Sequence, residues 1–366
     1  MRIGVVTTSF PRYPGDGAGS FVAEHVDWLR AQGHQVEVVC ADHDQAVDQP
    51  QVWRVAAGPG LFYEGGAPEA LARGHWPAAV GFTARLAAEL RRHDWDAMIA
   101  HWLVPAAVAA LARPRLPLAA IAHSGDVDLL CRTRAMPWVA RLLRARRARL
   151  TLVGEHLRQR VASSCSGSLA SWVRAAEVVP MGIDIQRFRA EPVARRSGRM
   201  VFLGRLVDIK GVRVLGQVMA ELAELGELVV AGDGPLRQQV EAWVARAGAR
   251  YIGPVRGRQR DELLQSAELV LIPSVELGER REGAPVTAFE AMAAGAAVVA
   301  SRSGGLSELP AETVTWIEPG SAESLLAAAR RLLSDQRERD RQLGCAAAYA
   351  AGRDWRVVGP RLMPPL

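Results

Sequence analysis

The sequence contains no asparagine and one lysine, Lys210, among its 45 basic residues. The absence of asparagine excludes an N-glycosylation acceptor, because that motif begins with Asn. Asparagine and lysine codons are AT-rich, so a GC-rich genome explains both shortages. The same bias would have replaced a lysine whose role arginine can fill. Lys210 is therefore a candidate functional residue.

Cysteine pairs and long hydrophobic runs are also missing. The four cysteines are far apart and form no C-x-x-C pair, so they predict neither a disulfide framework nor a zinc site. The apolar run Ile3–Val6 is too short for a signal-peptide core. The longest apolar stretch, Trp102–Ala122, is broken by two arginines and two prolines between residues 113 and 117. We expect a cytoplasmic protein without a membrane span, with peripheral contact to the inner face of the cell membrane left open.

The 366 residues suit two domains of ordinary size. Hydrophobic residues make up 49% and charged residues 23% of the chain, which excludes a disordered protein. The formal net charge of +6 indicates an anionic partner: a nucleotide, a phospholipid surface or a nucleic acid. Aromatic residues amount to 6% and do not interleave with basic ones, which argues against nucleic acid.

Short β-branched runs alternate with longer helical patterns along the chain, which predicts an α/β protein with parallel sheets covered by helices on both faces. One series of predicted strands starts at Arg2–Thr7 and ends at Glu177–Val179, and a second starts at Met200–Leu203 and ends at Val314–Ile317. The other predicted strands are Gln35–Cys40, Ala97–Ala100, Leu118–Ala122, Leu150–Val153, Glu227–Ala231, Arg250–Ile252, Glu268–Ile272 and Ala297–Ala300.

Two Rossmann-like, doubly wound domains follow from this pattern. We place the N-terminal domain at residues 1–184, a polar linker at 185–198, the C-terminal domain at 199–345, and a tail at 346–366 that we expect to pack back on the N-terminal domain. Ligands of such sheets bind at the carboxyl ends of the strands. Functional residues are therefore sought in the loops that follow strands.

A glycine-rich loop follows the first predicted strand. Gly15, Gly17 and Gly19 lie at alternate positions directly before a helix, so that their backbone N–H groups can bind phosphate or carboxylate. The loop matches neither G-x-G-x-x-G nor a Walker A sequence. A flexible turn explains it equally well.

Two cations follow the strand Met200–Leu203. Arg205 lies at the strand end and Lys210 opens the next helix, an arrangement that can place two positive charges on one diphosphate. Solvated surface charges are the alternative. The compact ammonium group of the single lysine favours the functional interpretation.

A tight turn with Gly232 and Gly234 follows the strand Glu227–Ala231. Turn geometry alone explains these glycines, and close backbone approach to a nucleobase or phosphate is the functional alternative.

The pair Glu282 and Glu290 is the strongest signal in the chain. Glu282 belongs to a predicted loop with Gly283, Ala284 and Pro285, and Glu290 belongs to a largely apolar helix face. A carboxylate in such surroundings is costly unless it is paired or bound to hydroxyl groups. Sugar and ribose hydroxyls fit, and we favour them over two solvated acids.

His123 follows the strand Leu118–Ala122 and can donate a hydrogen bond to a sugar hydroxyl or a phosphate. Position alone favours a structural histidine. Asp126 and Asp128 have the D-x-D form of a divalent-metal site, but no other acidic cluster supports one.

In this order the motifs resemble the retaining glycosyltransferases of family 4, which have the GT-B fold. The resemblance covers nearly the whole chain. Its most specific elements are E-x7-E at Glu282 and Glu290 and G-R-x4-K-G from Gly204 to Gly211. The supporting matches are Pro180–Asp184 with Phe188, His123 with Asp126, Gly232–Pro235, and the N-terminal glycine loop.

The resemblance implies two Rossmann-like domains facing a central cleft. It implies a nucleotide-sugar donor in the C-terminal domain, a saccharide or lipid-linked acceptor in the N-terminal domain, and transfer with retention of anomeric configuration. No metal cofactor is implied, because Arg205 and Lys210 would neutralise the donor diphosphate. The implied setting is cell-surface polysaccharide or glycolipid biosynthesis.

Further roles follow from the resemblance alone. Glu290 would accept hydrogen bonds from the ribose, and Glu282 and His123 would bind the donor sugar. The implied catalytic residues are His123, Glu282, Arg205 and Lys210. The implied donor-binding residues are Gly17, Gly19, Arg205, Lys210, Gly232, Gly234, Glu282, Gly283, Ala284, Pro285 and Glu290.

Two departures from the family pattern stand out. Met181 replaces the usual asparagine of the linker motif, and the loop Val275–Arg281 is unusually charged. The sequence leaves the donor base and sugar open, together with the acceptor and the oligomeric state.

A basic region extends from Arg132 to Arg160. It contains nine arginines and one acid, Glu155. On a helix from about Pro137 we expect Trp138, Val139, Leu142 and Leu143 to share one face, with Arg141 and Arg144 on the opposite, basic face, which can lie on anionic lipid. A solvated amphipathic helix is the alternative. For the whole chain the alternatives are a GT-B epimerase or phosphorylase, and a nucleotide-sugar-binding protein without transferase activity.

Overall fold

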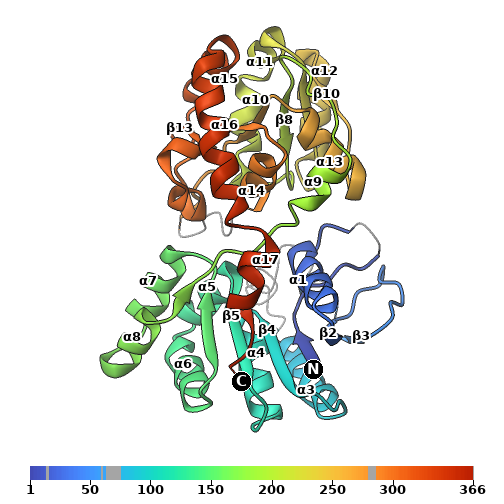
Figure 1. Ribbon diagram of the computed structural model, residues 1–366, viewed down its shortest axis with the longest axis vertical. Coiled ribbons are helices and arrows are strands. Elements are labelled where there is room, and N and C mark those ends of the chain that lie inside the picture. The colour runs from blue at the N-terminus through green and yellow to red at the C-terminus, as the bar shows by residue number, and fades with distance from the viewer. Residues whose placement is uncertain (14–15, 59–60, 63–75, 279–285, 366) are drawn as a thin grey trace. The chain divides into compact units, whose positions relative to one another are not determined.

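The computed structural model describes residues 1–13, 16–58, 61–62, 76–278 and 286–365 (Figure 1). The chain divides into two compact units. Unit 1 comprises Met1–Gly182 with Trp355–Leu366, and unit 2 comprises Ile183–Asp354. Each unit is a parallel sheet flanked by helices, so the predicted α/β class is confirmed.

Unit 1 contains a seven-stranded sheet in the order β3-β2-β1-β4-β5-β6-β7. Its strands are β1 (Arg2–Val6), β2 (Gln35–Ala41), β3 (Val52–Val55), β4 (Ala97–His101), β5 (Leu118–Ala122), β6 (Arg149–Leu152) and β7 (Glu177–Val178). Its helices include α1 (Ser20–Ala31), α3 (Trp76–Leu90), α4 (Leu103–Ala112), α5 (Ser124–Arg132), α6 (Met136–Ala145), α7 (Glu155–Ser163) and α8 (Gly167–Arg174). The strand order reverses between β1 and β4, which is the switch point where open α/β sheets bind ligands.

Unit 2 contains a six-stranded sheet in the order β10-β9-β8-β11-β12-β13. Its strands are β8 (Met200–Leu203), β9 (Leu228–Ala231), β10 (Arg250–Tyr251), β11 (Leu269–Ile272), β12 (Ala297–Ser301) and β13 (Thr315–Ile317). Its helices are α9 (Gln186–Ala190), α10 (Val212–Gln217), α11 (Met219–Leu225), α12 (Arg237–Ala247), α13 (Gly257–Ser266), α14 (Val286–Ala293), α15 (Ala322–Ser334) and α16 (Gln336–Ala351), with 3-10 turns η1 (Asp208–Lys210), η2 (Gly304–Glu308) and η3 (Ala311–Thr313). Here the switch point lies between β8 and β11.

Every predicted strand is present, with ends within one residue of the prediction. The strands could be predicted from their apolar runs because parallel strands are buried on both faces. All residues of β4, β5, β9, β11 and β12 are buried. The edge strand β3 was missed. Its Val52, Trp53 and Arg54 are only half-buried, so it lacks a continuous apolar run.

The units divide at positions that differ from the predicted domain limits. Ile183, Ile185 and Phe188, two of them within the predicted linker, belong to the hydrophobic core of unit 2. The predicted tail divides at Asp354, because its first residues complete α16 in unit 2. The remainder, α17 (Trp355–Val358) and the 3-10 turn η4 (Gly359–Leu362), packs against α1 of unit 1.

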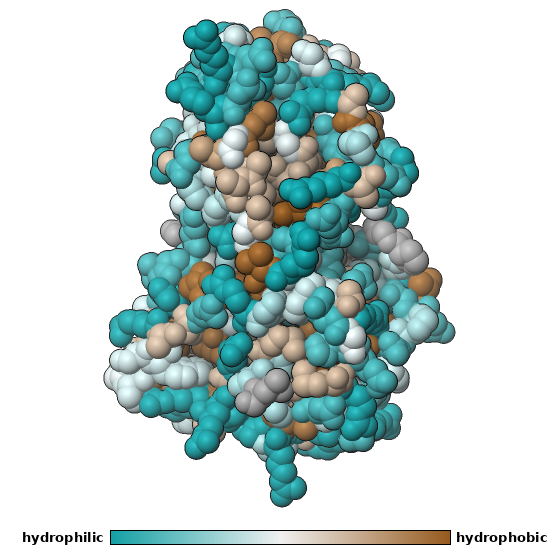
Figure 2. Space-filling view, in the orientation of Figure 1, coloured by the Kyte–Doolittle hydropathy of each residue, from teal (hydrophilic) through white to brown (hydrophobic). Residues whose placement is uncertain are grey.

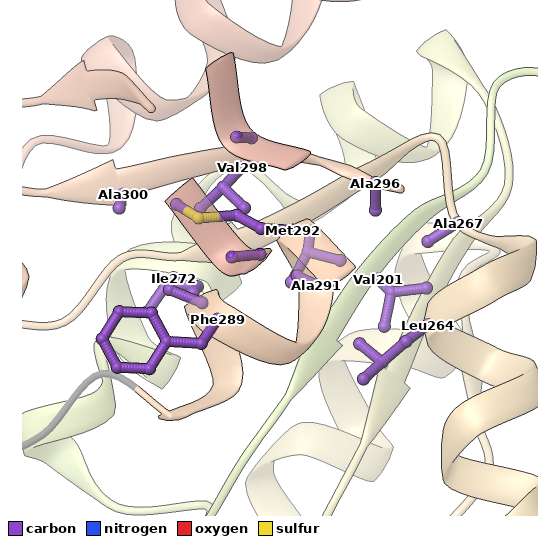
Figure 3. Close-up of a cluster of buried hydrophobic side chains, with 14 of the residues drawn as sticks. Val201, Leu264, Ala267, Ile272, Phe289, Ala291, Met292, Ala296, Val298 and Ala300 are labelled. Atoms are coloured by element: carbon purple, nitrogen blue, oxygen red, sulfur yellow. The ribbon is translucent and has the colours of Figure 1, made fainter. Parts of the chain in front are cut away.

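The core of unit 2 fixes α14, the helix that carries Glu290. Phe289 and Met292 point into a cluster formed with β8, β11, β12 and α13 (Figure 3). Both side chains are 1% exposed. Ala291 lets the helix lie close to the sheet. The apolar packing therefore holds the backbone around Glu290 in place.

Figure 2 shows one face, on which hydrophilic side chains surround small separate hydrophobic patches. Among the helices that the structure describes, none has the length and apolar character needed to cross a membrane.

Candidate functional site

Lys210 lies at the switch point of unit 2. It ends the short 3-10 turn η1, after β8, and lines a cavity of about 20 Å³ with Leu203, Ile272 and Thr287. This volume holds about one water molecule. Residues of the first turn of α14, Val286 to Ala288, line the same cavity, so a helix N-terminus and a lysine border one small space. The arrangement suits an anionic group.

Arg205 precedes Lys210 in the same loop. Its side chain is exposed and makes no hydrogen bond or ion pair with a described residue. The acid between the two cations, Asp208, pairs with Arg213 at 2.6 Å. Arg205 is thus not neutralised by its neighbour in the loop. The structure places both predicted cations in the loop that follows β8.

Gly232 and Gly234 support this cation loop from the neighbouring strand. Gly232 has φ +139°, and a Cβ there would lie 1.8 Å from the carbonyl oxygen of Gly204. A Cβ on Gly234 would lie 2.6 Å from the carbonyl oxygen of Leu206. The backbone N–H of Leu206 donates to the carbonyl of Asp233 at 2.8 Å. The structural interpretation of both glycines is therefore sufficient, and direct contact with a donor stays a prediction.

Glu290 is buried, with 1% of its side chain exposed, so the alternative of a solvated acid is wrong. Arg260 binds both carboxylate oxygens and Arg187 binds Oε1. Burial raises the pKa of Glu290, but the two guanidinium groups outweigh it and hold that pKa below its usual value. Arg187 also lies 3.2 Å from Asp261. The cluster joins α9, α13 and α14.

The arginine partners bear on the ribose role expected for Glu290. A carboxylate offers about four lone-pair sites, and three are taken by the two arginines. About one site is left for a hydroxyl group. Sequence reasoning missed Arg187 and Arg260, although Arg187 directly precedes Phe188 of the linker motif.

His123 lies at the N-terminus of α5, directly after β5, and is 6% exposed. Its Nε2 lies 3.2 Å from Nδ1 of His101, whose Nε2 lies 3.1 Å from Nδ1 of His25. Burial lowers the pKa of His123 to about 3, so its ring is neutral. The partner of His123 within the fold is thus a second histidine.

Asp126 does not form a metal site with Asp128. Its Oδ2 accepts hydrogen bonds from the backbone N–H groups of Leu103 and Val104 at the start of α4, whereas Asp128 pairs with Arg160 at 3.2 Å. Burial raises the pKa of Asp126 to about 7 despite these bonds. In the part of the chain that the structure describes, no group of three or more histidine, cysteine or acidic side chains could hold a metal ion.

An ion pair between Arg12 and Asp16 restrains the N-terminal glycine loop, and sequence reasoning missed it. Asp16 lies 2.6 Å from Arg12 and accepts a hydrogen bond from the N–H of Ala18. Gly19 caps α1 with φ +66°, and a Cβ there would lie 2.4 Å from the carbonyl oxygen of Ser9. A Cβ on Gly17 would meet no atom within 4 Å. Of the two glycines of this loop that the structure describes, Gly17 is the one with open space around its Cα.

The remaining predicted site residues, Glu282, Gly283, Ala284 and Pro285, lie outside the described residues, as does Gly15. The structure therefore brings together part of the predicted donor site, namely the cation loop with its two supporting glycines. His123 belongs to unit 1 and Glu290 to a separate buried cluster of unit 2.

Helix α6 of the basic region corrects one prediction. Met136, Ala140 and Leu143 form its buried side, whereas Trp138 is 72% exposed. The prediction that Trp138 lies on the apolar face opposite Arg141 is wrong, because Trp138 is exposed on the same side of the helix as Arg141. The Arg141 guanidinium lies 5.2 Å from the Trp138 ring centroid.

These features define a protein with two doubly wound α/β units, one of which carries Arg205 and Lys210 in the loop that follows β8 at its switch point. Sequence comparison places the protein within this class. The profile described as "Glycosyltransferase Family 4" matches residues 15–187, and the profile "Glycosyl transferases group 1" matches residues 197–335. The chain belongs to this family of glycosyltransferases, group 1 or family 4, and has the GT-B fold.

Individual relatives agree with this assignment. The chain is 30% identical over 222 residues to the 2-deoxystreptamine glucosyltransferase of Streptomyces kanamyceticus, covering 54% of each protein. It is also 30% identical over 227 residues to the GDP-mannose-dependent alpha-(1-6)-phosphatidylinositol monomannoside mannosyltransferase of Mycolicibacterium smegmatis, covering 56% of each. The matches thus span little more than half the length of these relatives.

Among solved structures, the Anabaena protein HepE in complex with UDP superposes with a TM-score of 0.70 at 16% identity. The superposition covers 99% of this chain and 98% of that one. At this identity the likeness shows the fold alone.

We expect Glu290→Gln to lower the free energy of unfolding by at least about 2 kcal/mol, because it leaves two guanidinium groups without their shared anion. Glu262→Gln is the matched control. Glu262 pairs with Arg258 on the surface of α13 with 43% of its side chain exposed, and its loss should cost less than about 1 kcal/mol. Urea denaturation of both variants measures the difference. Equal losses would show that the buried cluster does not stabilise unit 2.

We expect Asp126→Asn to gain stability relative to the wild type as the pH rises. The pKa of Asp126 is about 7 in the folded protein and 3.8 in the unfolded chain, so the folded state holds the extra proton between these values. Wild-type stability from this group is complete below pH 3.8 and falls by up to about 1.4 kcal/mol per pH unit as the pH rises towards 7. Asparagine cannot ionise and keeps an oxygen for Leu103 and Val104. Unfolding free energies at pH 5 and pH 8 give the test, with the exposed Asp44→Asn as baseline. A pH-independent difference for Asp126→Asn would contradict the prediction.

Proposed function

We propose that the protein transfers a sugar from a nucleoside diphosphate donor to a saccharide or lipid-linked acceptor, with retention of anomeric configuration. The observation that carries the proposal is the position of Lys210 beside the cavity at the β8–β11 switch point. Membership of a glycosyltransferase family supports it. The UDP complex of a protein with the same fold supports a nucleotide ligand.

In the proposed reaction, the bond between the anomeric carbon and the diphosphate oxygen breaks, and its electron pair goes to the leaving diphosphate. The acceptor hydroxyl oxygen forms the new bond to carbon on the same face, and its proton passes to the departing phosphate oxygen. Lys210 and Arg205 stabilise the charge that develops on the diphosphate, which is where electrostatic catalysis is most effective. Glu290 takes one ribose hydroxyl at its remaining lone-pair site.

The acceptor side of the proposal rests on α6. The exposed Trp138 with Arg141 stacked on it combines an amphipathic ring with a cation, which suits the headgroup region of an anionic membrane. Arg132, Arg134 and Arg147 are exposed nearby in the sequence. A relative named for a phosphatidylinositol mannoside substrate agrees with a lipid-linked acceptor. We propose peripheral binding through this face and a role in cell-surface glycan or glycolipid synthesis.

Calorimetric titration with UDP, GDP and ADP, with and without EDTA, tests the donor site. We expect one nucleotide to bind with or without the chelator. Lys210→Ala should weaken that binding about tenfold or more, since a hydrogen bond to a charged group contributes about 1.5–3 kcal/mol. Arg213→Ala is the matched control, because this exposed cation lies close in sequence and is already paired with Asp208.

Unchanged affinity in Lys210→Ala would contradict the diphosphate assignment. Failure of all three nucleotides to bind the wild type would favour a protein without transferase activity. Binding that disappears with EDTA would require a metal ion and overturn the metal-independent mechanism.

Vesicle sedimentation tests the membrane contact. We expect the wild type to sediment with phosphatidylglycerol vesicles at low salt, and the double variant Trp138→Ser with Arg141→Ser to lose most of this binding. Arg330→Ser, an exposed arginine of α15 in unit 2, serves as control. Equal sedimentation of all three proteins would assign α6 to the solvated surface.

A further inference from the structure

Three histidines from three different elements form a buried row in unit 1. His25 lies on α1, His101 ends β4, and His123 follows β5. Their exposed fractions are 0%, 0% and 6%. The ring nitrogens meet in sequence, His25 Nδ1 with His101 Nε2 at 3.1 Å and His101 Nδ1 with His123 Nε2 at 3.2 Å.

The rings are neutral. Burial lowers the pKa of His25 and of His123 to about 3 and lowers that of His101 well below its usual value. A neutral imidazole carries one N–H and one lone pair. Each contact in the row therefore needs a donor on one ring and an acceptor on the other. A ring that donates through Nδ1 must accept through Nε2. All three rings must therefore be the same tautomer, with the proton either on Nδ1 in each ring or on Nε2 in each ring.

The surroundings of His25, at one end of the row, determine in which direction the hydrogen bonds of the row run. Nε2 of His25 is buried and has no hydrogen-bond partner among the described residues. The ring of His25 stacks on Trp355 at 5.0 Å and lies 6.0 Å from Trp28. Indole nitrogens donate and never accept. A proton on Nε2 would therefore be a buried N–H without an acceptor, which proteins avoid more strictly than an acceptor without a full set of partners.

The lone pair thus belongs on Nε2 of His25, and the proton on Nδ1. His25 then donates to His101, and His101 donates through its own Nδ1 to Nε2 of His123. The last proton must reside on Nδ1 of His123. Among the described residues His123 hydrogen-bonds through Nε2 to His101, and its Nδ1–H makes no such contact, so we assign that donor to a ligand.

The surroundings hold the outer ring in place. Phe21 and Trp102 lie 5.0 and 4.8 Å from the His123 ring. Trp102 has φ +71°, a conformation that a tryptophan adopts only when its surroundings impose it. Backbone strain of this kind gathers at functional sites. It supports a role for this end of the row beyond packing.

We propose that the row His25–His101–His123 fixes His123 as its Nδ1–H tautomer, so that His123 presents a permanent hydrogen-bond donor and no acceptor to the substrate. His101 and His25 are positioning residues that act through His123. The ligand atom that fits is an oxygen lone pair of a sugar hydroxyl group, and proton abstraction by His123 is ruled out. The functional part of this inference rests on the proposed transferase activity.

Nitrogen-15 NMR of the histidine rings in the full-length wild type tests the tautomers without any substitution. We expect all three rings to be protonated on Nδ1 and unprotonated on Nε2, and to remain so from pH 7 to pH 5. Protonation of His123 on Nε2 would reverse the row and overturn the proposal. A protonated, cationic His101 in this range would also overturn it, because that ring would donate to both neighbours.

His101→Phe tests the positioning role, since the ring shape is kept and both hydrogen bonds are lost. We expect a mixture of His123 tautomers and a kcat about tenfold lower, the value of one hydrogen bond. The affinity for the nucleoside diphosphate should be unchanged, because the cations that bind it belong to unit 2. His93→Phe is the control, a buried histidine of unit 1 outside the row whose partners are Glu37 and Glu89.

The outcomes separate the two proposals. Nδ1–H tautomers with an unchanged kcat in His101→Phe would overturn the positioning role while leaving the transferase assignment intact. A wild type that binds no nucleotide and transfers no sugar would overturn the proposed function, and the tautomer measurement would still decide the direction of the row. If His101→Phe fails to fold, the wild-type spectrum alone retains the power to refute the inference.

Discussion

The buried carboxylate of Glu290 is the constraint on which the candidate site of unit 2 depends. An ionised group in an apolar interior is costly unless its charge is matched, and here α9 and α13 each supply a guanidinium group to α14. Two kinds of contact therefore hold α14: the ion pairs of Glu290 and the apolar packing of Phe289 and Met292. Because α14 is fixed, its first turn keeps its place beside Lys210 at the switch point.

Unit 1 also buries polar side chains, but there most of them are uncharged. Its buried polar residues beside the carboxyl ends of β4 and β5 are three uncharged imidazoles and an aspartate whose pKa burial raises to about 7. No guanidinium group pairs with this aspartate among the described residues; backbone N–H groups of α4 serve it instead. Hydrogen bonds between neutral groups carry direction but no net charge. The hydrogen bonds of unit 1 therefore determine which atoms act as donors. The arginine cluster of unit 2 instead determines where the charges lie.

The features that could be predicted from the sequence are those that depend on neighbouring residues in the chain. Strands buried on both faces produce continuous β-branched runs, so their positions were predictable, and β3 was missed because Trp53 and Arg54 interrupt such a run. The cost of burying Glu290 was also predictable, but its partners were not, since Arg260 lies 30 and Arg187 103 residues away. His25 and His101 were missed for the same reason. The error at Trp138 came from assigning a helix face without knowing which side packs on the sheet.

The groups gathered in the two units differ in chemistry, and each set matches a different part of the proposed nucleoside diphosphate donor. A nucleoside diphosphate presents concentrated negative charge, for which an ammonium group and a helix N-terminus are the matching partners. A sugar presents neutral hydroxyl groups, which are distinguished by the direction of a hydrogen bond rather than by charge. A histidine that could both donate and accept would bind a hydroxyl in either orientation. In the proposed row His123 is only a donor, which removes one of these orientations. Under that proposal the buried histidines would contribute a selectivity that a single exposed imidazole could not provide.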